Sequence, residues 1–346
     1  MTVAPGQPGS AATEDLPEPD RRDGELLVRG RLIGVCGTDR EIAAGAYGEA
    51  PADADRLIIG HEGLGEVLAA PAGSGFSPGD LVAGIVRRPD PVPCPACADG
   101  HWDMCRNDRF FERGIVRSHG YGSQLWSVEP GYAVRIPSEL GELGVLLEPT
   151  SVLAKAWDQV DRIAERGFAR RDTALVTGAG PIGLLAALLG AQRGYEMHVV
   201  DLPVEGAKRD LVESLGGIYH SGDAAAVDAE VDVVIECTGI GAVGRAAGSR
   251  LVNGGIMSLT GIMDADTTQA VNSTEMNRRM VLRNAVLFGT VNAGRRHWEQ
   301  AAEALAAADP AWLSRMITRS VPLSSWTDAL ERQADDIKVV VDLTAG

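Results

Sequence analysis

The chain has 346 residues, 45% of them hydrophobic and 23% charged, which is enough apolar material for two domains with a cleft between them. Its formal net charge of −16 repels phosphate backbones, and with no basic stripe carrying aromatics this excludes nucleic acid as an expected partner. No apolar stretch reaches the roughly 20 residues that span a bilayer, and residues 1–20 lack the pattern of a secretion signal, so we expect a cytoplasmic protein that contacts no membrane.

Residues 1–154 predict a mostly β domain. The segment is rich in Gly and Pro and contains short alternating runs, such as LLVRGRLIGV at 26–35 and DLVAGIV at 80–86. Alternation of apolar and polar residues is typical of strands with one buried face.

Residue types that bind zinc occur in two motifs of this domain. Cys36 lies in GVCGTDREI (34–42), and His61 and Glu62 lie in IIGHEGLG (58–65). A catalytic zinc takes about three protein ligands and keeps one position open. A single Cys or His is often simply packed in a core. The three residues together favour a catalytic zinc site.

Three of the five cysteines, Cys94, Cys97 and Cys105, fall within twelve positions. In a large chain such clustering indicates metal binding before disulfide formation. The other two, Cys36 and Cys237, stand alone.

Residues 155–300 predict a doubly wound α/β domain. Short β-branched runs alternate there with helical stretches, the order that builds a parallel sheet with helices between its strands. The expected strands are TALVT (173–177), MHVVD (197–201), VDVVIE (231–236), GGIMSL (254–259) and VLFGT (286–290).

A glycine pattern, Gly178-x-Gly180-x-x-Gly183, follows the first of these strands. Such glycines permit a tight turn and close approach of a pyrophosphate, while the N-terminus of the next helix faces the anion. Asp201 ends the second strand at about the spacing of a carboxylate that binds the ribose 2′-hydroxyl, and it would repel a 2′-phosphate. The pattern therefore predicts NAD in preference to NADP.

Residues 301–346 are expected to pack back on the first domain. An Ala-rich helix covers 301–308, an amphipathic helix lies near 326–334, and KVVVDL at 338–343 predicts a final strand.

The motifs GVCGTD, GHE, PGD (78–80), the cysteine cluster and GAGPIG occur in the order seen in zinc-containing medium-chain alcohol dehydrogenases. Within that superfamily, CGTDREI, the Arg pair at 87–88, ERGI (112–115), EPTSV (148–152) and VNAGRRHWEQA (291–301) most resemble the glucose 1-dehydrogenases. The resemblance covers nearly the whole chain. It implies a GroES-like catalytic domain over 1–154, an NAD-binding Rossmann domain over 155–300 and a C-terminal segment over 301–346.

The resemblance also implies roles for single residues. Cys36, His61, Glu62 and Glu148 correspond to the catalytic zinc site, and Thr38 to the hydroxyl that passes the substrate proton outward. Glu41 stands where related enzymes often have a relay histidine, which is a departure from the pattern. The expected coenzyme contacts are Gly178, Gly180, Pro181, Ile182, Gly183, Asp201, Thr238 and Asn292.

Cys94, Cys97 and Cys105 correspond to three of four cysteines in the structural zinc lobe of the superfamily. The missing first cysteine falls at about Pro91, which cannot bind a metal. A closed zinc site needs four ligands, so Asp90, Asp99 or Asp108 would complete it, with Asp108 chosen here, or the lobe holds no metal.

Glu112, Glu148 and His297 correspond to groups that contact sugar hydroxyls, and Asn292 lies near the nicotinamide. Val86 and Val152 replace two polar positions of the glucose enzymes, which makes glucose itself only a first guess. The resemblance further implies a homo-oligomer, a dimer or tetramer.

These residues predict a zinc-dependent oxidoreductase that transfers a hydride to NAD from a secondary alcohol or anomeric hydroxyl of a sugar-like polyol. One alternative is a dehydrogenase of a cyclitol, amino sugar or nucleoside. Another is a zinc-free quinone-reductase-like or nucleotide-sensing protein, against which the retention of Cys36, His61 and Glu148 argues.

Overall fold

The computed structural model describes residues 1–19, 22–167, 172–262 and 271–345. The chain forms two compact units, Met1–Ser151 with Asn292–Gly346 and Val152–Val291. The boundaries expected from sequence lay slightly later, at residues 154 and 300. They differ because helix α3 (Leu147–Ala164) runs across the first boundary and helix α8 (Arg295–Ala306) belongs entirely to the first unit.

The first unit is built on a seven-stranded, mostly antiparallel sheet with the order β10-β5-β4-β2-β18-β17 and β9 paired to β2. Strand β2 (Leu26–Val35) alternates in burial at its start and is buried over its last four residues. The other strands of this sheet are β4 (Glu62–Ala69), β5 (Leu81–Gly84), β9 (Leu125–Val128), β10 (Ala133–Arg135), β17 (Ile317–Pro322) and β18 (Lys338–Asp342).

Shorter elements surround this sheet. Two small sheets contain β1 (Thr2–Val3) with β3 (Leu57–Ile58), and β6 (Arg87–Arg88) with β7 (Phe111–Arg113) and β8 (Arg117–Ser118). The remaining helices of this unit are α1 (Gly37–Ala43), α2 (Pro95–Ala98), α9 (Pro310–Met316) and the 3-10 helices η1 (Trp102–Met104), η2 (Pro130–Tyr132), η3 (Gly141–Leu146) and η5 (Leu323–Ala329).

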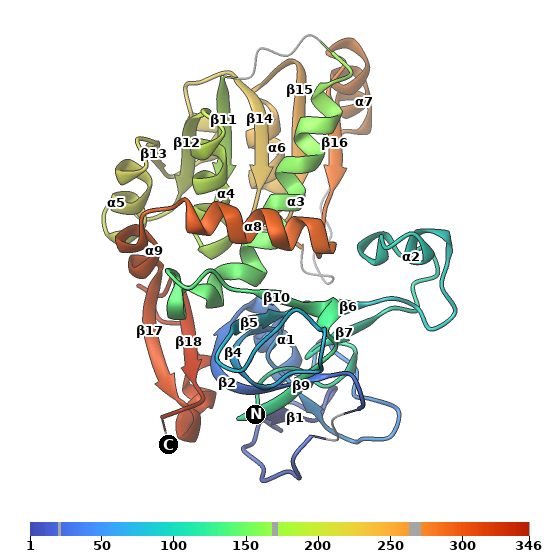
Figure 1. The fold of residues 1–346 in the computed structure, drawn as a ribbon. Coiled ribbons are helices and arrows are strands. Elements are labelled where there is room, and N and C mark those ends of the chain that lie inside the picture. The colour runs from blue at the N-terminus through green and yellow to red at the C-terminus, as the bar shows by residue number, and fades with distance from the viewer. Residues whose placement is uncertain (20–21, 168–171, 263–270, 346) are drawn as a thin grey trace. The chain divides into compact units, whose positions relative to one another are not determined.

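The C-terminal strands belong to this sheet, and Figure 1 shows β17 and β18 in red beside the blue strands from the start of the chain. The amphipathic helix expected near 326–334 is wrong. The chain forms the 3-10 helix η5 instead, which contains a non-helical residue at Ser325 and ends at Ala329, and residues 330–337 contain no helix. Strand β17 is not among the strands expected from sequence, because three consecutive polar residues separate Ile317 from Val321 and no apolar run or regular alternation marks the segment.

The second unit contains a six-stranded parallel sheet with the order β13-β12-β11-β14-β15-β16. Five of its strands are those expected, and the sixth, β13 (Ile218–Ser221), is a short edge strand with little buried apolar surface. The others are β11 (Thr173–Thr177), β12 (Glu196–Asp201), β14 (Val231–Glu236), β15 (Leu251–Leu259) and β16 (Val286–Gly289). This strand order defines a doubly wound nucleotide-binding sheet and confirms the expected α/β fold.

Helices α4 (Pro181–Gln192), α5 (Ala207–Ser214), α6 (Gly241–Gly248), α7 (Ser273–Leu282) and η4 (Ala224–Ala226) connect these strands. One core cluster packs Leu175, Val200 and Val234 of the sheet against Ala247 of α6 and Ala224 of η4.

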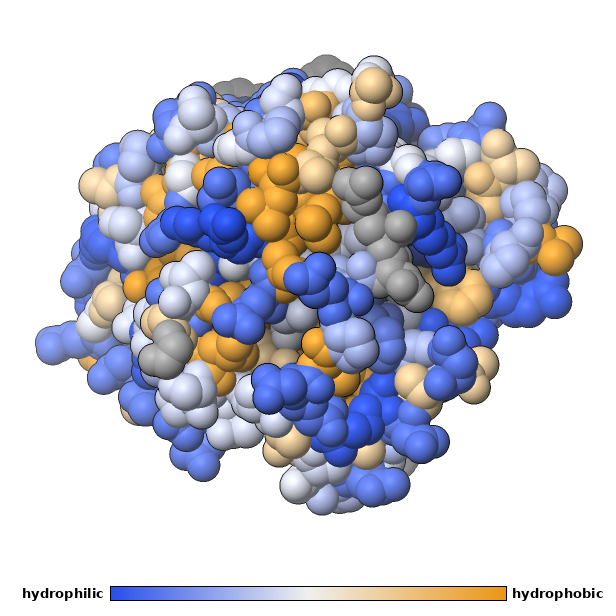
Figure 2. All heavy atoms as spheres, turned by 60° about the horizontal axis from the view of Figure 1, so that its bottom comes forward, coloured by the Kyte–Doolittle hydropathy of each residue, from blue (hydrophilic) through white to orange (hydrophobic). Residues whose placement is uncertain are grey.

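No helix in the described ranges is long and apolar enough to cross a membrane. On the face drawn in Figure 2, hydrophilic residues separate the clusters of hydrophobic ones. Most large apolar side chains instead lie in the cores, as is usual for a globular chain.

The turn from β11 into α4 depends on close backbone contacts. Gly178 has φ +82°, a conformation that favours glycine, and its N–H donates to Val200 O at 2.7 Å. A methyl group on Gly183 would overlap the carbonyl oxygen of Gly178, whereas a methyl group on Gly180 would meet no atom within 4 Å.

We therefore expect Gly183→Ala to lower the free energy of unfolding by about 3 kcal/mol or more, because rigid backbone must move to admit the methyl group. Gly180→Ala should leave stability nearly unchanged and act only on coenzyme affinity. Denaturant unfolding of both variants measures this, and equal stability of the two would contradict the close packing described here.

Candidate functional site

Cys36 lies where β2 ends and α1 begins. It is the N-cap residue of α1, in extended backbone (φ −119°), and its Sγ accepts a hydrogen bond from Thr38 N at 3.2 Å. Its own N–H donates to Asp39 Oδ2 at 2.9 Å. The helix cap therefore holds the sulfur in a fixed place at the end of the central strand.

His61 directly precedes β4, the neighbour of β2 in the sheet. Gly60, with φ +88°, makes the turn that brings the imidazole back toward β2. His61 Nε2 lies 3.1 Å from Cys36 Sγ, and Nδ1 lies 3.3 Å from Asp39 Oδ1. Asp39 thus contacts both residues and orients the ring, as the carboxylate partners of metal-binding histidines do.

Glu148, at the start of α3, completes the group. Carboxylate oxygens of Glu62 and Glu148 and a ring nitrogen of His61 lie within 4.8 Å of one another. Atoms of Cys36, Asp39 and His61 form a second group that shares His61. His61 therefore belongs to both groups, and the other residues that the sequence analysis placed in a zinc site, Cys36, Glu62 and Glu148, lie around it.

This donor set fits zinc. Bonds of about 2.3 Å to sulfur and about 2.05 Å to nitrogen at a tetrahedral angle would place the two atoms about 3.6 Å apart. The observed separation of 3.1 Å between Cys36 Sγ and His61 Nε2 needs only a few tenths of an ångström of movement. One thiolate, one imidazole and one carboxylate leave a fourth position for water or substrate.

The buried charges shift the pKa values of these groups. Burial raises the pKa of Glu148 to about 7, and the nearby Glu62 carboxylate adds to the rise. Burial lowers the pKa of His61, but the Cys36 thiolate and the Asp39 carboxylate outweigh it and raise that pKa well above its usual value. For Asp39, burial is opposed by His61 and by Cys36 N–H, and its pKa falls.

Lys338 supplies a buried cation at this centre. Its side chain is 1% exposed, its Nζ forms an ion pair with Glu62 Oε2, and it also donates to Val35 O at 3.3 Å. Gly34 makes room for the pair, since a methyl group there would overlap Glu62 Oε2. Glu62 is therefore held by a lysine in this structure, although it stands beside the other candidate ligands.

Thr38 lies in the first turn of α1, half-buried, directly beside the Cys36 sulfur. Glu41, one turn further on, is exposed. Thr38 therefore lies near the candidate ligands, and Glu41, the departure from the usual histidine, lies at the surface.

Glu112 is buried on β7 and engaged by two side chains. Arg87 donates from Nε (3.0 Å) and from a terminal nitrogen (2.9 Å) to Glu112 Oε1, and Asn292 Nδ2 donates to the same oxygen at 2.8 Å. The Arg87 guanidinium also stacks on Phe110 at 3.8 Å. The structure thus joins the expected sugar residue Glu112 to the expected nicotinamide residue Asn292.

His297 is buried in the first turn of α8. Its Nδ1 faces Gly294 N at 3.1 Å and its Nε2 faces Arg296 Nε at 3.1 Å. A sugar hydroxyl would have to displace Arg296 to reach this ring.

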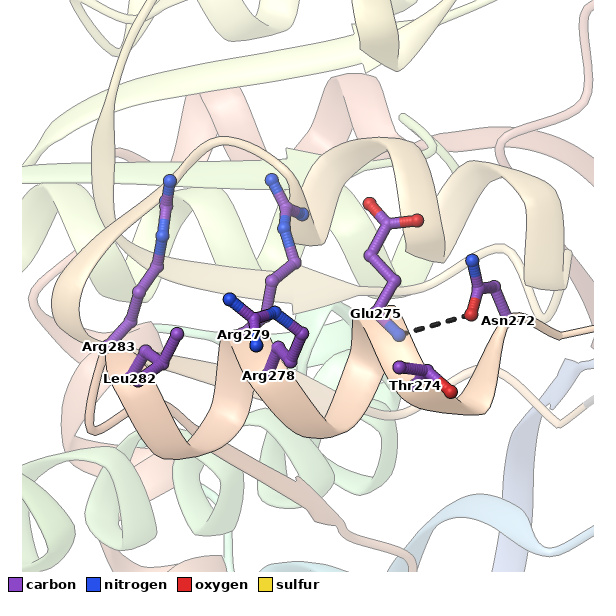
Figure 3. Close-up of a pocket in the computed structure, with 7 residues that line it drawn as sticks. All are labelled: Asn272, Thr274, Glu275, Arg278, Arg279, Leu282 and Arg283. Atoms are coloured by element: carbon purple, nitrogen blue, oxygen red, sulfur yellow. Dashed lines mark hydrogen bonds between the residues drawn. The ribbon is translucent and has the colours of Figure 1, made fainter.

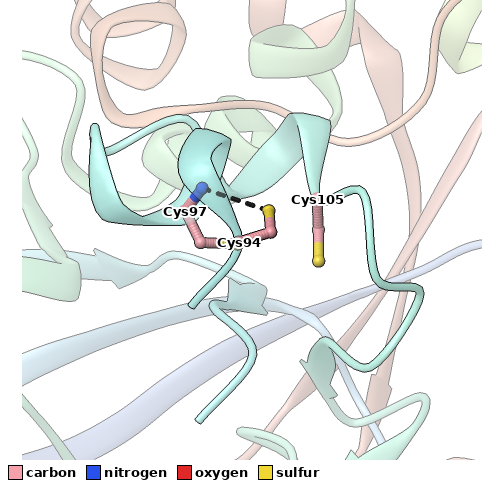
Figure 4. A group of neighbouring side chains, drawn as sticks. All are labelled: Cys94, Cys97 and Cys105. Atoms are coloured by element: carbon pink, nitrogen blue, oxygen red, sulfur yellow. Dashed lines mark hydrogen bonds between the residues drawn. The ribbon is translucent and has the colours of Figure 1, made fainter. Parts of the chain in front are cut away.

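The three clustered cysteines meet in a separate lobe around α2 and η1, drawn in Figure 4. Their sulfur atoms lie within 4.8 Å of one another. Among the described residues the group stops at these three, so the structure does not bring Asp108 to the sulfur atoms as a fourth ligand.

The coenzyme-binding motif lies in the second unit. Gly180 is the N-cap of α4, and Pro181 begins the helix. Asp201 ends β12, and its Oδ2 accepts from Ala179 N at 3.1 Å and pairs with Lys208 Nζ at 2.9 Å. Asp201 is therefore at the glycine turn, as expected, but shares its charge with a lysine.

Thr238 follows β14, opposite Gly178. Its N–H donates to Glu236 Oε1 at 2.7 Å, and its hydroxyl also contacts that oxygen. The buried Glu236 accepts further bonds from Thr177 Oγ1 (3.2 Å) and Gly239 N (3.2 Å). It holds the turn that carries Thr238.

The sequence analysis did not identify Asp39, Lys338 or Arg87. Asp39 could have been found, because an acid three residues after an N-cap is a capping-box signature. Lys338 is the lone cation at the start of an apolar strand, and Arg87 follows an apolar run, which are weaker signals.

Comparison with known proteins identifies the family that has this architecture. Residues 22–138 match the family model of the alcohol dehydrogenase GroES-like domain, and residues 141–343 match that of the glucose dehydrogenase C-terminus. With the doubly wound sheet, these matches define the class of medium-chain alcohol dehydrogenases.

The chain is 37% identical to glucose 1-dehydrogenase of Methanocella arvoryzae and 38% identical to that of Thermoproteus tenax, in each case over 99% of both proteins. The solved structure of Haloferax mediterranei glucose dehydrogenase in complex with NADP, Zn and gluconolactone matches with a TM-score of 0.91 and 30% identity, over 100% of this chain and 99% of that one. The chain belongs to the glucose dehydrogenase family, which confirms the resemblance seen in its motifs.

In the metal-free protein, we expect zinc affinity to rise with pH across pH 7. Zinc requires an ionised Glu148 and a neutral His61, and both have raised pKa values, so binding must release their protons. Each proton that binding releases raises the zinc affinity about tenfold for every unit increase in pH. Competition with a chelator at pH 6, 7 and 8 measures this.

The titration is best made on a Cys97→Ser protein, in which the separate cysteine lobe is disrupted. Glu148→Gln is the matched control and should reduce the slope of the profile near pH 7, because only the His61 proton then remains to be released. An affinity independent of pH in the unmodified centre would show that these groups do not bind the metal.

Proposed function

We propose that this protein is a zinc-dependent dehydrogenase that oxidises a hydroxyl-bearing carbon of a sugar and reduces NAD. The observation that carries this proposal is the 3.1 Å approach of Cys36 Sγ to His61 Nε2, close to the spacing of two zinc ligands, with the Glu62 and Glu148 carboxylates grouped around the same His61. A zinc ion bound there supplies Lewis-acid polarisation of the substrate hydroxyl. The reaction moves a hydride from the carbon to the nicotinamide and releases the hydroxyl proton.

The chain's own residues position and deprotonate the substrate. Asp39 fixes the ring of His61 through Nδ1 and so keeps Nε2 directed at Cys36. Thr38, beside the sulfur, takes the hydroxyl proton and passes it toward solvent. Glu62 is an outer carboxylate held by Lys338, and the resident ligands are Cys36, His61 and Glu148.

The proposed substrate is a polyhydroxylated ring oxidised at its anomeric carbon. Glu112, Asn292 and Glu148 offer polar atoms that can bind several hydroxyls, and Asn292 already bonds to Glu112. The Haloferax mediterranei relative was solved with gluconolactone, a sugar lactone. Val86 is buried and apolar, so it cannot form a hydrogen bond to a substrate hydroxyl. The alternative substrate is therefore a cyclitol or an amino sugar, whose substituents differ from those of glucose.

NAD is the proposed coenzyme. Asp201 stands at the glycine turn, where a carboxylate binds the ribose hydroxyls and repels a 2′-phosphate. Lys208 weakens that repulsion because it pairs with the same carboxylate, and the Haloferax mediterranei structure contains NADP. The preference for NAD should therefore be moderate.

We further propose a homo-oligomer that assembles through the β16 edge. Among the residues that the structure describes, β16 pairs only with β15 and no residue of α7 is buried. Exposed apolar side chains lie on both elements, namely Met276, Val281, Leu282 and Leu287. Unpaired edges of this kind readily pair with another strand.

The charges of α7 suit a two-fold contact with a second copy. Figure 3 shows Glu275 near the start of the helix and Arg278, Arg279 and Arg283 toward its end. Antiparallel pairing about a two-fold axis would place each glutamate opposite the partner's arginines. We also propose that the protein acts in the cytoplasm, because its five cysteines are all thiols.

Cys36→Ser should lower turnover about a thousandfold or more while NAD still binds, because zinc chemistry is lost and the coenzyme turn lies in the other unit. The assay follows coenzyme reduction across aldoses, polyols and cyclitols, with NAD binding measured separately. Cys237→Ser, which alters a thiol outside the group, should keep its zinc. Near-normal turnover of the Cys36 variant would refute the zinc mechanism.

Wild-type enzyme should turn over faster with NAD than with NADP at equal concentrations. Asp201→Asn should reduce that preference about tenfold, because it removes the charge that repels the 2′-phosphate. Lys208→Ala should slow the NADP reaction more than the NAD reaction. A wild-type preference for NADP would overturn this assignment.

Light scattering should find the protein larger than a monomer. Leu287→Lys places a charge on the β16 edge and should yield monomers, whereas Ile218→Lys, at the opposite edge of the same sheet, should not. Monomeric wild-type protein, or loss of assembly in the Ile218 variant alone, would exclude the β16 edge.

A further inference from the structure

The lobe that contains Cys94, Cys97 and Cys105 has the donor arrangement of a metal site. Cys94 and Cys97 are buried, and the Cys94 sulfur accepts hydrogen bonds from Arg106 N (3.3 Å) and Cys97 N (3.5 Å). Figure 4 shows the second of these bonds, with the Cys105 side chain beside the pair. Backbone N–H groups directed at the Cys94 sulfur favour its thiolate, the form that binds metals, whereas burial raises the pKa of Cys97, so a cation bound there must displace the Cys97 proton.

The structure supplies no fourth protein ligand within the described residues. Asp90 is buried, but its oxygens accept from Val92 N (2.8 Å), Asn107 Nδ2 (2.8 Å) and Arg109 Nε (3.2 Å). Asp99 and Asp108 are exposed. Of the Cys, His, Asp and Glu side chains in the described chain, only the three thiols meet here. These residues do not fit a closed, four-ligand structural zinc site.

Three sulfur atoms with an open fourth position make a different kind of site. Thiolates select soft or borderline cations such as Zn²⁺ and Cd²⁺. An open position is filled by water or by a small molecule, and the cation exchanges more readily than one enclosed by four protein ligands.

The lobe is also connected to the candidate sugar pocket. The 3-10 helix η1 (Trp102–Met104) lies between Cys97 and Cys105, and the carbonyl of its Asp103 accepts from Arg87 at 3.4 Å. Arg87 holds Glu112 through two hydrogen bonds, and Glu112 accepts from Asn292. Arg87, Asp103 and Glu112 are all buried, so the chain of contacts passes through the interior.

A second contact joins η1 to α8. A methyl group on Gly294, the N-cap of α8, would lie 2.8 Å from Asp103 Oδ1, so the carboxylate lies directly against the start of that helix. A carboxylate there interacts favourably with the positive end of the helix dipole. Asp103 therefore contacts both segments that carry the proposed pocket residues.

We propose that the three thiols bind one thiophilic divalent cation with an open fourth position, and that this cation fixes η1 and thereby the Arg87–Glu112–Asn292 arrangement. Loading the lobe raises the affinity for the sugar and leaves the chemical step unchanged. The coupling to sugar affinity rests on the proposed function, whereas the cation site does not.

Cadmium titration tests the site, because cadmium–thiolate bonds absorb in the ultraviolet. The protein is used with its catalytic zinc in place, and the titration is repeated on Cys36→Ser so that only the signal common to both is counted. We expect one Cd²⁺ per chain, at least tenfold weaker binding in Cys97→Ser and Cys105→Ser, and unchanged binding in the matched controls Asp99→Asn and Asp108→Asn. Weaker binding in Asp108→Asn would show a closed site and overturn the proposal.

The open coordination position can be tested by the absorbance change when a fourth sulfur binds to the cation. An added monothiol should enter as a fourth sulfur and increase the absorbance by about one third, from three thiolates to four. A closed site would show no change, which would also overturn the proposal.

Hydrogen exchange tests the coupling without any turnover. Cadmium should slow exchange in the segments around Arg87 and around Glu112 as well as in the lobe, and Arg87→Lys should confine the protection to the lobe. Protection confined to residues 94–106 in the wild type would refute the coupling.

Kinetics complete the test. The KM for the sugar should rise threefold or more when the lobe is stripped or in Cys97→Ser, while kcat stays within twofold. An unchanged KM would refute the effect on sugar affinity. A protein that binds cadmium and shows the exchange pattern, yet oxidises no sugar, would refute the proposed function and leave the cation site standing.

Discussion

The proposed catalytic centre depends on one buried carboxylate, that of Asp39. One of its oxygens accepts the Cys36 N–H and the other faces His61 Nδ1. Cys36 and His61 come from neighbouring strands, and without a common partner their side chains would have several rotamers each. Asp39 reduces these to one arrangement in which sulfur and nitrogen stand 3.1 Å apart. The preorganisation needed for metal binding is thus present in the protein itself.

Burying the negative charge of this carboxylate is unfavourable, and other charged groups of the centre offset that cost. Asp39, Glu62 and Glu148 gather three acids beside a thiol in a buried place, where unpaired charge is strongly disfavoured. Lys338 neutralises one of them, His61 pairs with another, and the raised pKa of Glu148 keeps that group protonated over part of the neutral range. A divalent cation would replace the His61 and Glu148 protons as the compensating charge.

Much of the fold could be predicted from sequence because its signals are local. The central strands β11 and β14 of the second unit are continuous apolar runs that are buried on both faces, and the glycine turn has a fixed spacing. Cys36, His61 and Glu148 were predicted as metal ligands from short motifs, and the structure places Cys36 and Glu148 in groups that share His61. The 326–334 helix was wrong because a periodic pattern does not show where a helix ends, and the chain leaves the helical conformation after Ala329.

Residues whose roles depend on distant partners were harder to find. Lys338 bonds to the carbonyl of Val35, 303 positions earlier in the chain, and nothing in KVVVDL indicates that its lysine points inward. Arg87 acquires its role only when β6 pairs with β7 and brings Glu112 alongside. Asp108 was chosen as a metal ligand by spacing alone, and spacing does not specify which way a loop side chain points.

The pairing of β18 with β2 has a consequence for biosynthesis. The second unit is one continuous segment and can fold as soon as it leaves the ribosome, at the usual roughly 5–20 residues per second of synthesis. The first unit cannot finish until later, because the strand that inserts beside β2 and brings the Lys338 ammonium to Glu62 follows the second unit in the chain. Until that strand is made, β2 keeps an open edge and the Glu62 carboxylate lacks its ammonium partner. We therefore expect the centre to take up metal only after β18 has joined the sheet.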